Sequence, residues 1–207
     1  MSKKRNTSTK SNKSGKSITS NKLLWISVIG AVILILIVTA AVVESSSRSA
    51  GTAANEAGNQ TTAGLKTGNK IGELAPDFTL TTIDGKTMNL YDYRGKNIIL
   101  NFWATWCGPC TYEVPFLRQI DETWAKAGVA IIAVNTQDNV ENAAIYAKRH
   151  NLNFVIPVDP RGGVATMFNV HGLPTTFFID SDGVIKSVKV GPFINTGEIE
   201  ERMSQFK

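Results

Sequence analysis

The chain has 207 residues, which is enough for one ordinary domain plus accessory segments. Its charge is uneven: residues 1–22 contain seven Lys or Arg and no acid, whereas residues 71–207 contain 12 Lys or Arg against 15 Asp or Glu. This mildly acidic main part shows none of the basic bias of nucleic-acid-binding domains. The two cysteines are too few for a disulfide scaffold, and a structural zinc site normally needs about four ligands.

The first 43 residues predict a membrane anchor. Residues 1–22 are rich in Ser, Asn, Thr and Lys, a composition typical of a disordered tail. Residues 23–43 form a run of 21 residues without a charge, long enough to cross a bilayer as a helix. The basic flank precedes this run, so the positive-inside rule places the tail in the cytoplasm and the rest of the chain outside. The alternative is a signal peptide cleaved near Thr39-Ala40-Ala41, which would release a secreted protein.

Residues 44–70 are mostly Ser, Gly, Ala, Thr and Asn, which predicts a flexible linker. The folded domain is therefore expected over residues 71–207.

Within this domain, strand and helix patterns alternate along the chain. We expect a hairpin over 75–90 that turns at Asp84-Gly85, strands at 97–103, 129–135, 153–158, 175–179 and 184–190, helices at 107–127, 140–150 and 196–206, and helical turns at 163–168. This order predicts an α/β domain of three layers with a mixed central sheet. Thr196 is the expected N-cap of the last helix. In the last strand, Ser187 and Lys189 alternate with apolar residues, which predicts one solvent-facing side.

Both cysteines lie in one motif, Cys107-Gly108-Pro109-Cys110, between a predicted buried strand and a predicted helix. The amino-terminal turn of a helix favours a thiolate, the form of cysteine that attacks a disulfide. Cys110 follows one turn later, where its sulfur can reach that of Cys107. Gly108 has no side chain to obstruct a partner, and Pro109 lacks only a donor that the first turn does not use. We therefore predict a redox-active dithiol at Cys107 and Cys110.

Two neighbouring features complete this site. Trp106 is expected to cover the dithiol and to offer a flat apolar surface; the alternative is ordinary core packing. A second motif, Gly172-Leu173-Pro174-Thr175-Thr176, places a proline directly before a predicted strand. From the residues alone, Pro174 could equally be an ordinary trans proline in a loop.

Together these motifs resemble the thioredoxin-like superfamily, and within it the membrane-anchored TlpA/ResA-like thiol-disulfide oxidoreductases. The resemblance covers residues 71–207 and is carried by Ala75-Pro76-Asp77-Phe78, by Asn101 to Cys110, by Glu113 with Pro115, and by Gly172 to Thr176. It implies a thioredoxin-like fold in which Cys107 is the exposed nucleophile and Cys110 the buried resolving thiol. It also implies that Pro174 is a cis-proline beside the dithiol, which turns the Leu173 backbone toward a partner chain. The implied substrate-binding residues are Trp106, Gly108, Pro109, Leu173 and Pro174.

Glu113 is a third candidate catalytic residue. It lies three residues after Cys110 and thus on the same side of the helix. A partly buried carboxylate there would have a raised pKa and could accept the Cys110 proton. The alternative is a solvated glutamate near a helix start; the resemblance, in which this position carries a functional glutamate, favours the catalytic role.

The motifs predict a thiol-disulfide oxidoreductase but not the direction of electron flow. The resemblance implies a reductant of protein disulfides that uses no cofactor or metal beyond the Cys107–Cys110 disulfide. It further suggests apocytochrome c as client and a CcdA/DsbD-type membrane protein as electron donor. The alternatives are an extracytoplasmic thiol oxidase, a peroxiredoxin-type peroxidase, in which a stretch like residues 75–78 also occurs, and a tethered binding module without redox turnover.

Overall fold

A computed structural model describes residues 64–206. The predicted tail, the predicted membrane span and residues 44–63 of the predicted linker lie outside these residues. Within residues 64–206, no helix combines the length and the apolar character needed to cross a membrane.

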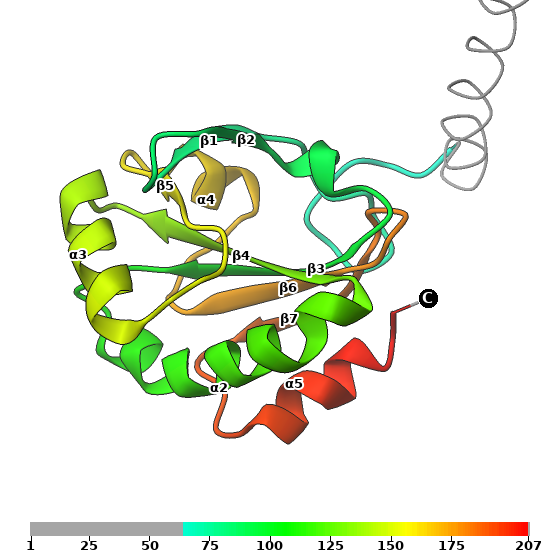
Figure 1. Ribbon diagram of the computed structural model, residues 1–207. Helices are drawn as coiled ribbons and strands as arrows, with labels where there is room; N and C mark the ends of the chain where they lie inside the picture. Colours follow the sequence, from blue (N-terminus) through cyan, green and yellow to red (C-terminus); the bar gives the residue numbers. More distant parts are fainter. Residues whose placement is uncertain (1–63, 207) are drawn as a thin grey trace, which may run out of the picture. The chain divides into compact units, whose positions relative to one another are not determined.

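The centre of the domain is a mixed sheet of seven strands (Figure 1). The strands are β1 (Thr79–Thr82), β2 (Thr87–Asn89), β3 (Asn97–Trp103), β4 (Val129–Thr136), β5 (Pro157–Asp159), β6 (Thr175–Ile179) and β7 (Ile185–Val190), in the order β2-β1-β5-β4-β3-β6-β7. Strands β3, β4 and β5 are parallel, whereas the pairs β1–β2, β1–β5, β3–β6 and β6–β7 are antiparallel. This arrangement confirms the predicted mixed sheet.

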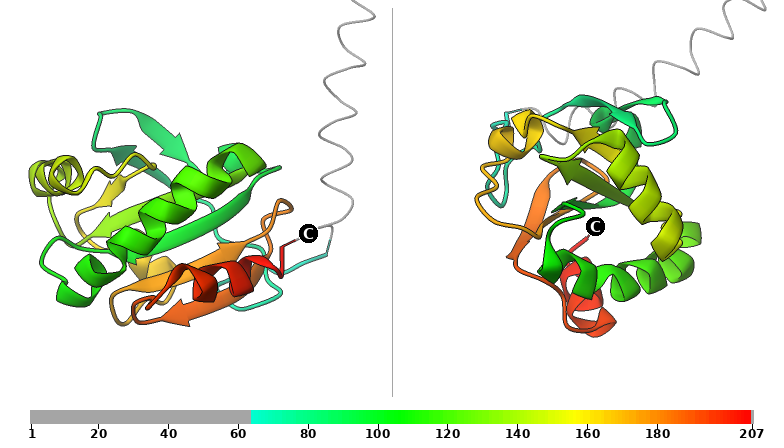
Figure 2. Two further views of the ribbon diagram at one scale, coloured as in Figure 1. Left: turned by 60° about the horizontal axis from the view of Figure 1, so that its bottom comes forward. Right: turned by 90° about the vertical axis from the view of Figure 1, so that its left-hand side faces the viewer.

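Helices cover both faces of the sheet, which gives the predicted three layers (Figures 1 and 2). Helices α2 (Gly108–Trp124), α3 (Val140–His150) and α5 (Thr196–Met203) lie on one face, and the short α4 (Gly163–Met167) lies on the other. The 3-10 turns η1 (Leu90–Tyr93) and η2 (Ala125–Ala127) follow β2 and α2. Pro115 lies inside α2, and the helix continues through it.

The apolar run of β3 is buried on both sides because it lies near the middle of the sheet. Ile99 packs toward α2 and α5, whereas Leu100 and Phe102 pack toward α4. On the α4 side, the ring of Phe168 contacts those of Phe102 and Phe177 at centroid distances of 5.4 and 5.1 Å. The strand that leads to the dithiol motif is therefore held in the core of the domain.

Three predicted elements have other boundaries in the structure. Helix α2 ends at Trp124, and the residues predicted to continue it form the 3-10 turn η2. Strand β5 begins at Pro157 rather than at residue 153, and Val155 makes only an isolated bridge to Ile132. Helix α5 ends at Met203, and its N-cap is Asn195 rather than Thr196, since the Asn195 side chain accepts the Glu198 N–H. An asparagine one position earlier satisfies the same free donor.

The expected solvent-facing side of β7 was also wrong. Ser187 is buried, and its hydroxyl accepts a hydrogen bond of 2.8 Å from Arg202 of α5. Lys189 forms an ion pair of 2.8 Å with Glu198 of the same helix. Helix α5 folds back over the polar side of β7, so the side that carries Val190 is the more exposed one.

Candidate active site

Strand pairing brings the two sequence motifs together. Strands β3 and β6 are antiparallel neighbours, and Phe102 near the end of β3 pairs with Thr175 at the start of β6. The loop after β3 and the loop before β6 therefore lie at the same edge of the sheet. The Leu173–Pro174 peptide bond is cis. The fold thus brings Cys110 and Pro174, which are 64 positions apart in the chain, to the same edge of the sheet.

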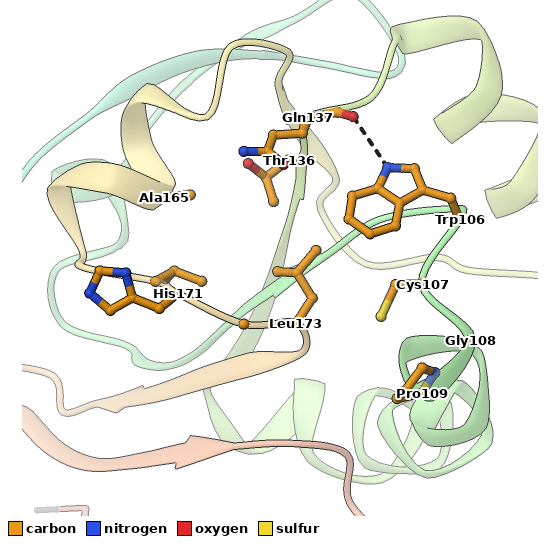
Figure 3. A pocket seen from close by; sticks show the side chains of 11 residues that line it. Trp106, Cys107, Gly108, Pro109, Thr136, Gln137, Ala165, His171 and Leu173 are labelled. Carbon is orange, nitrogen blue, oxygen red and sulfur yellow. Dashed lines mark hydrogen bonds between the residues drawn. The ribbon is translucent and has the colours of Figure 1, made fainter.

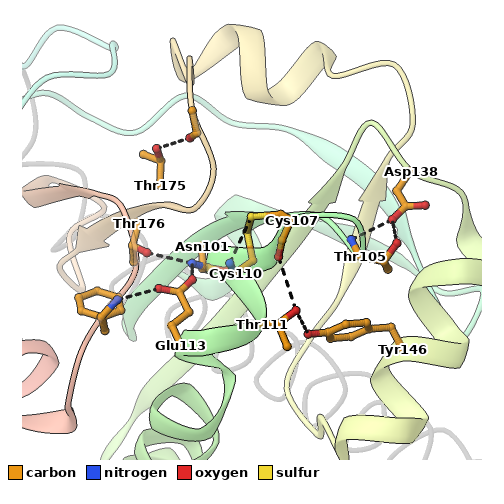
Figure 4. Close-up of a disulfide and its surroundings, with 12 residues drawn as sticks. Asn101, Thr105, Cys107, Cys110, Thr111, Glu113, Asp138, Tyr146, Thr175 and Thr176 are labelled. Carbon is orange, nitrogen blue, oxygen red and sulfur yellow. Dashed lines mark hydrogen bonds between the residues drawn. A yellow bond between two sulfur atoms is a disulfide. The ribbon is translucent and has the colours of Figure 1, made fainter.

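The two cysteines form a disulfide at the amino-terminal end of α2 (Figure 4). Their Cα atoms are 5.3 Å apart. Cys107 is the N-cap of the helix, one position before the expected first turn, and its Sγ accepts the Cys110 N–H at 3.2 Å. In the reduced protein, the same N–H group and the helix dipole favour a thiolate on Cys107.

The two sulfurs have different surroundings. Cys107 lines an open hollow of about 460 Å³ (Figure 3). Both side chains are buried, Cys107 at 5% exposed and Cys110 at 1%, but Cys110 lines a much smaller crevice of about 10 Å³, together with Glu113 and Asn101. A partner that approaches through the open hollow therefore meets Cys107 first.

The predicted substrate-binding residues surround this hollow, with one exception. Trp106 is 61% exposed, so the alternative of core packing was wrong. Its indole N–H donates to the Gln137 carbonyl at 3.2 Å, and Gln137 adopts a left-handed conformation with φ of 54°. Pro174 is buried and does not line the hollow. The predicted residues that do line it are Trp106, Gly108, Pro109 and Leu173.

Asp138, in the loop between β4 and α3, is a functional candidate that the sequence analysis missed. Its Oδ2 accepts the backbone N–H of Thr105 at 3.0 Å and the Thr105 hydroxyl at 2.5 Å. Burial alone would raise the pKa of Asp138, but hydrogen bonds from Thr105, Asn139 and Asn142 hold the pKa below its usual value. The aspartate thereby anchors the loop that carries Trp106 and Cys107. A lone aspartate after a predicted strand gives no signal of this contact.

A second unpredicted contact supports the start of α2. The Tyr146 hydroxyl of α3 donates to Thr111 Oγ1 at 2.9 Å (Figure 4). The ring of Tyr146 also packs against Trp103, with centroids 5.0 Å apart. Helix α3 therefore holds the first turn of α2 in place.

Glu113 is buried beside Cys110, so the solvated alternative was wrong. It is 1% exposed, and its two oxygens accept hydrogen bonds from Asn101 Nδ2 at 2.9 Å and from the Phe193 N–H at 3.1 Å (Figure 4). Burial raises the pKa of Glu113 to about 7, although these two hydrogen bonds favour the charged form. A carboxyl group with this pKa can exchange a proton near neutral pH.

His171 is exposed on the side of the hollow opposite Trp106 (Figure 3). Within residues 64–206, no three His, Cys, Asp or Glu side chains are grouped so that they could hold a metal ion.

A disulfide at the start of the helix that follows a central strand, next to a cis-proline loop, defines a thioredoxin-like thiol-disulfide exchange protein. Comparison with known proteins makes the assignment more specific. Residues 71–188 match the family model described as the AhpC/TSA family. The chain is 39% identical over 142 residues to the thiol-disulfide oxidoreductase ResA of Geobacillus kaustophilus, which covers 69% of this chain and 81% of that protein.

Two further relatives agree. The thioredoxin-like protein YneN of Bacillus subtilis is 35% identical over 147 residues, which covers 70% of this chain and 85% of that protein. The crystal structure of a thiol:disulfide interchange protein of the thioredoxin family from Chlorobium tepidum superposes with a TM-score of 0.58 at 30% identity, over 63% of this chain and 93% of that one. The chain belongs to the AhpC/TSA family and, within it, to the ResA-like thiol-disulfide oxidoreductases.

Proposed function

We propose that this oxidoreductase reduces disulfides of client proteins, with Cys107 as nucleophile, Cys110 as resolving thiol and Glu113 as proton acceptor. The observation that carries the proposal is the asymmetry of the pair: Cys107 lines the open hollow of about 460 Å³, whereas Cys110 lines a crevice of about 10 Å³ beside Glu113.

The reaction passes through a mixed disulfide. The Cys107 thiolate attacks one sulfur of the client disulfide, which breaks the client S–S bond and releases the other sulfur as a thiolate that takes a proton from solvent. Cys110 then loses its proton and attacks Cys107 Sγ, which displaces the second client sulfur. Two electrons have moved to the client, and the protein is left with the Cys107–Cys110 disulfide that the structure contains.

Glu113 is placed to assist the second step. Its carboxyl group and Cys110 line the same small cavity, away from the open hollow. With its pKa raised to about 7, the ionised group is a stronger base than an ordinary carboxylate and can take the Cys110 proton. Asn101 and the Phe193 N–H hold the carboxyl group in position.

The surroundings of the hollow support a polypeptide as substrate. Trp106 offers an exposed apolar face on one side, and the backbone before the cis bond at Leu173 lies on the other (Figure 3). An extended client segment can pair with such a backbone as a short strand. Trp106, Gly108, Pro109, Leu173 and Pro174 are accordingly proposed as the substrate-binding residues.

The cellular setting of this activity is part of the proposal. Residues 23–43 would anchor the chain in the cell membrane, the tail of residues 1–22 would stay in the cytoplasm, and the linker of residues 44–70 would carry the catalytic domain of residues 71–207 outside. Apocytochrome c is the proposed client and a CcdA/DsbD-type membrane protein the proposed donor. The relationship to ResA and the charge pattern of residues 1–43 support this setting.

A trapping experiment tests the proposal. Because Cys110→Ser removes the resolving thiol, this variant should accumulate a mixed disulfide through Cys107, whereas Cys107→Ser should trap no client. Identification of the attached protein tests the apocytochrome c assignment. Equilibration with glutathione tests the direction: a reduction potential near the value of about −120 mV typical of strong thiol oxidants would overturn the reductant assignment and favour the oxidase.

A further inference from the structure

A second hollow lies next to the one that Cys107 lines. It has a volume of about 210 Å³ and lies against β6 and β7 on the α4 side of the sheet. His171 and Gly172 line both hollows, so the two meet at the loop before the cis-proline. The other lining residues are Asn69, Phe168, Asn169, Thr175, Phe177, Val188 and Val190.

The second hollow has an apolar base and a neutral polar rim. Phe168 and Phe177 are buried beneath it, and Val190 is 71% exposed. Asn69 and Asn169 supply polar groups at the rim. Neither hollow is lined by any Lys, Arg, Asp or Glu. The combined surface therefore suits an uncharged, partly apolar segment better than an acidic or basic one.

The position of Val190 follows from the packing of β7. Helix α5 covers the side of β7 that carries Ser187 and Lys189, so Val188 and Val190 project to the opposite side. Val190 also pairs with Thr175, the residue after Pro174, which places it at the active-site end of the sheet. A single exposed valine is common on protein surfaces. This one lines a hollow that shares the His171–Gly172 loop with the hollow of Cys107.

We propose that the second hollow is a specificity subsite that binds an apolar side chain of the client, a few residues from the cysteine that Cys107 attacks. The proposal rests on the proposed function, because the client must cross the His171–Gly172 loop to reach both hollows. The occupant is an extended, uncharged client segment. Val190 is the specificity-determining contact, since it is the most exposed apolar residue of the subsite.

Model peptides test this subsite with the full chain. Disulfide-linked homodimers of a neutral Ser/Gly nonapeptide with one central cysteine offer the same sulfur to Cys107 from either half. A leucine then replaces each residue except the cysteine, one position at a time, and KM and kcat are measured with dithiothreitol as reductant. We expect leucine on one side of the cysteine to lower KM about tenfold at one or two adjacent positions, and aspartate or lysine there to give no gain.

Three variants assign the effect to the second hollow. Val190→Asp should abolish the gain from leucine, and the isosteric but polar Val190→Thr should reduce it. Ile145→Asp, at an exposed apolar residue of α3 that lines neither hollow, should leave it unchanged. All three should reduce the small disulfide 5,5′-dithiobis(2-nitrobenzoate) at the wild-type rate and keep the wild-type reduction potential.

The outcomes separate this inference from the proposed function. Loss of turnover with every disulfide would contradict the proposed function. Normal turnover with the same KM for every leucine position would overturn the subsite alone. So would a gain from leucine that persists in Val190→Asp. If Val190→Asp turned over all peptides faster than the wild type, the occupant of the hollow would be the chain's own linker. If the wild type were a dimer that Val190→Asp dissociates, the occupant would be a second copy of the chain. Either result overturns the client subsite.

Discussion

Replacement of Glu113 by glutamine is the sharpest test of the buried carboxyl group. In the oxidised protein, burial raises its pKa from 4.5 to about 7. Between these values the native state binds a proton that the unfolded state has lost, so the free energy of unfolding must fall as pH rises. A difference of about 2.5 pKa units corresponds to about 3 kcal/mol, fully present below pH 4.5 and lost as pH rises through 7.

Glutamine removes this titration but not the shape of the side chain. Its single acceptor oxygen can serve Asn101 or the Phe193 N–H but not both, which costs about 1–3 kcal/mol at every pH. This constant cost drops out when the two proteins are compared across pH. The unfolding free energy of the wild type minus that of Glu113→Gln should therefore fall by about 3 kcal/mol from pH 4.5 to pH 8, to near zero or below.

Urea unfolding of the oxidised full chain at a series of pH values measures this difference. Glu122→Gln, on the exposed side of the same helix, is the matched control and should run parallel to the wild type. A wild-type minus Glu113→Gln difference that stays constant with pH would refute the raised pKa. In disulfide exchange, Glu113→Gln should slow the resolving step about 100-fold at neutral pH, and equal rates across the pH range would remove Glu113 from the mechanism.

Three other changes test the support around the dithiol and the core beneath it. Asp138→Asn should weaken the anchoring of Thr105 and lower stability by about 1–2 kcal/mol, with a rise in KM for protein clients; unchanged client kinetics would show that the loop does not need this anchor. Tyr146→Phe keeps the ring but removes the hydrogen bond to Thr111, so urea unfolding should report a loss of about 1 kcal/mol or less, and a larger loss would mean that the hydroxyl does more than this contact. Phe168→Ala should cost about 3–5 kcal/mol by leaving a cavity among packed rings, and a thermal midpoint close to that of the wild type would contradict the core packing.

Much of the fold could be predicted from local sequence signals. The apolar run of β3, helix α3 and the short strand β6 were predicted at their observed ends. These elements depend on contacts between near neighbours in the chain: side-chain periodicity, a capping side chain, or a proline that precedes a strand. The dithiol motif at a helix start is local in the same sense, because the donors that surround Cys107 belong to the residues directly after it.

The rest was decided by residues far apart in the chain. Ser187 appeared solvent-facing because its alternation with apolar residues says nothing of a helix that returns 15 positions later through Arg202. Trp106 could be placed in the core or on the surface until Gln137 fixed its indole. Burial and electrostatics depend on what the fold packs against a side chain, and for Glu113 that includes Phe193, 80 positions away. The sequence alone therefore determined which groups can do the chemistry. The tertiary structure decided which sulfur lines the open hollow and which carboxyl group is buried enough to hold its proton near neutral pH.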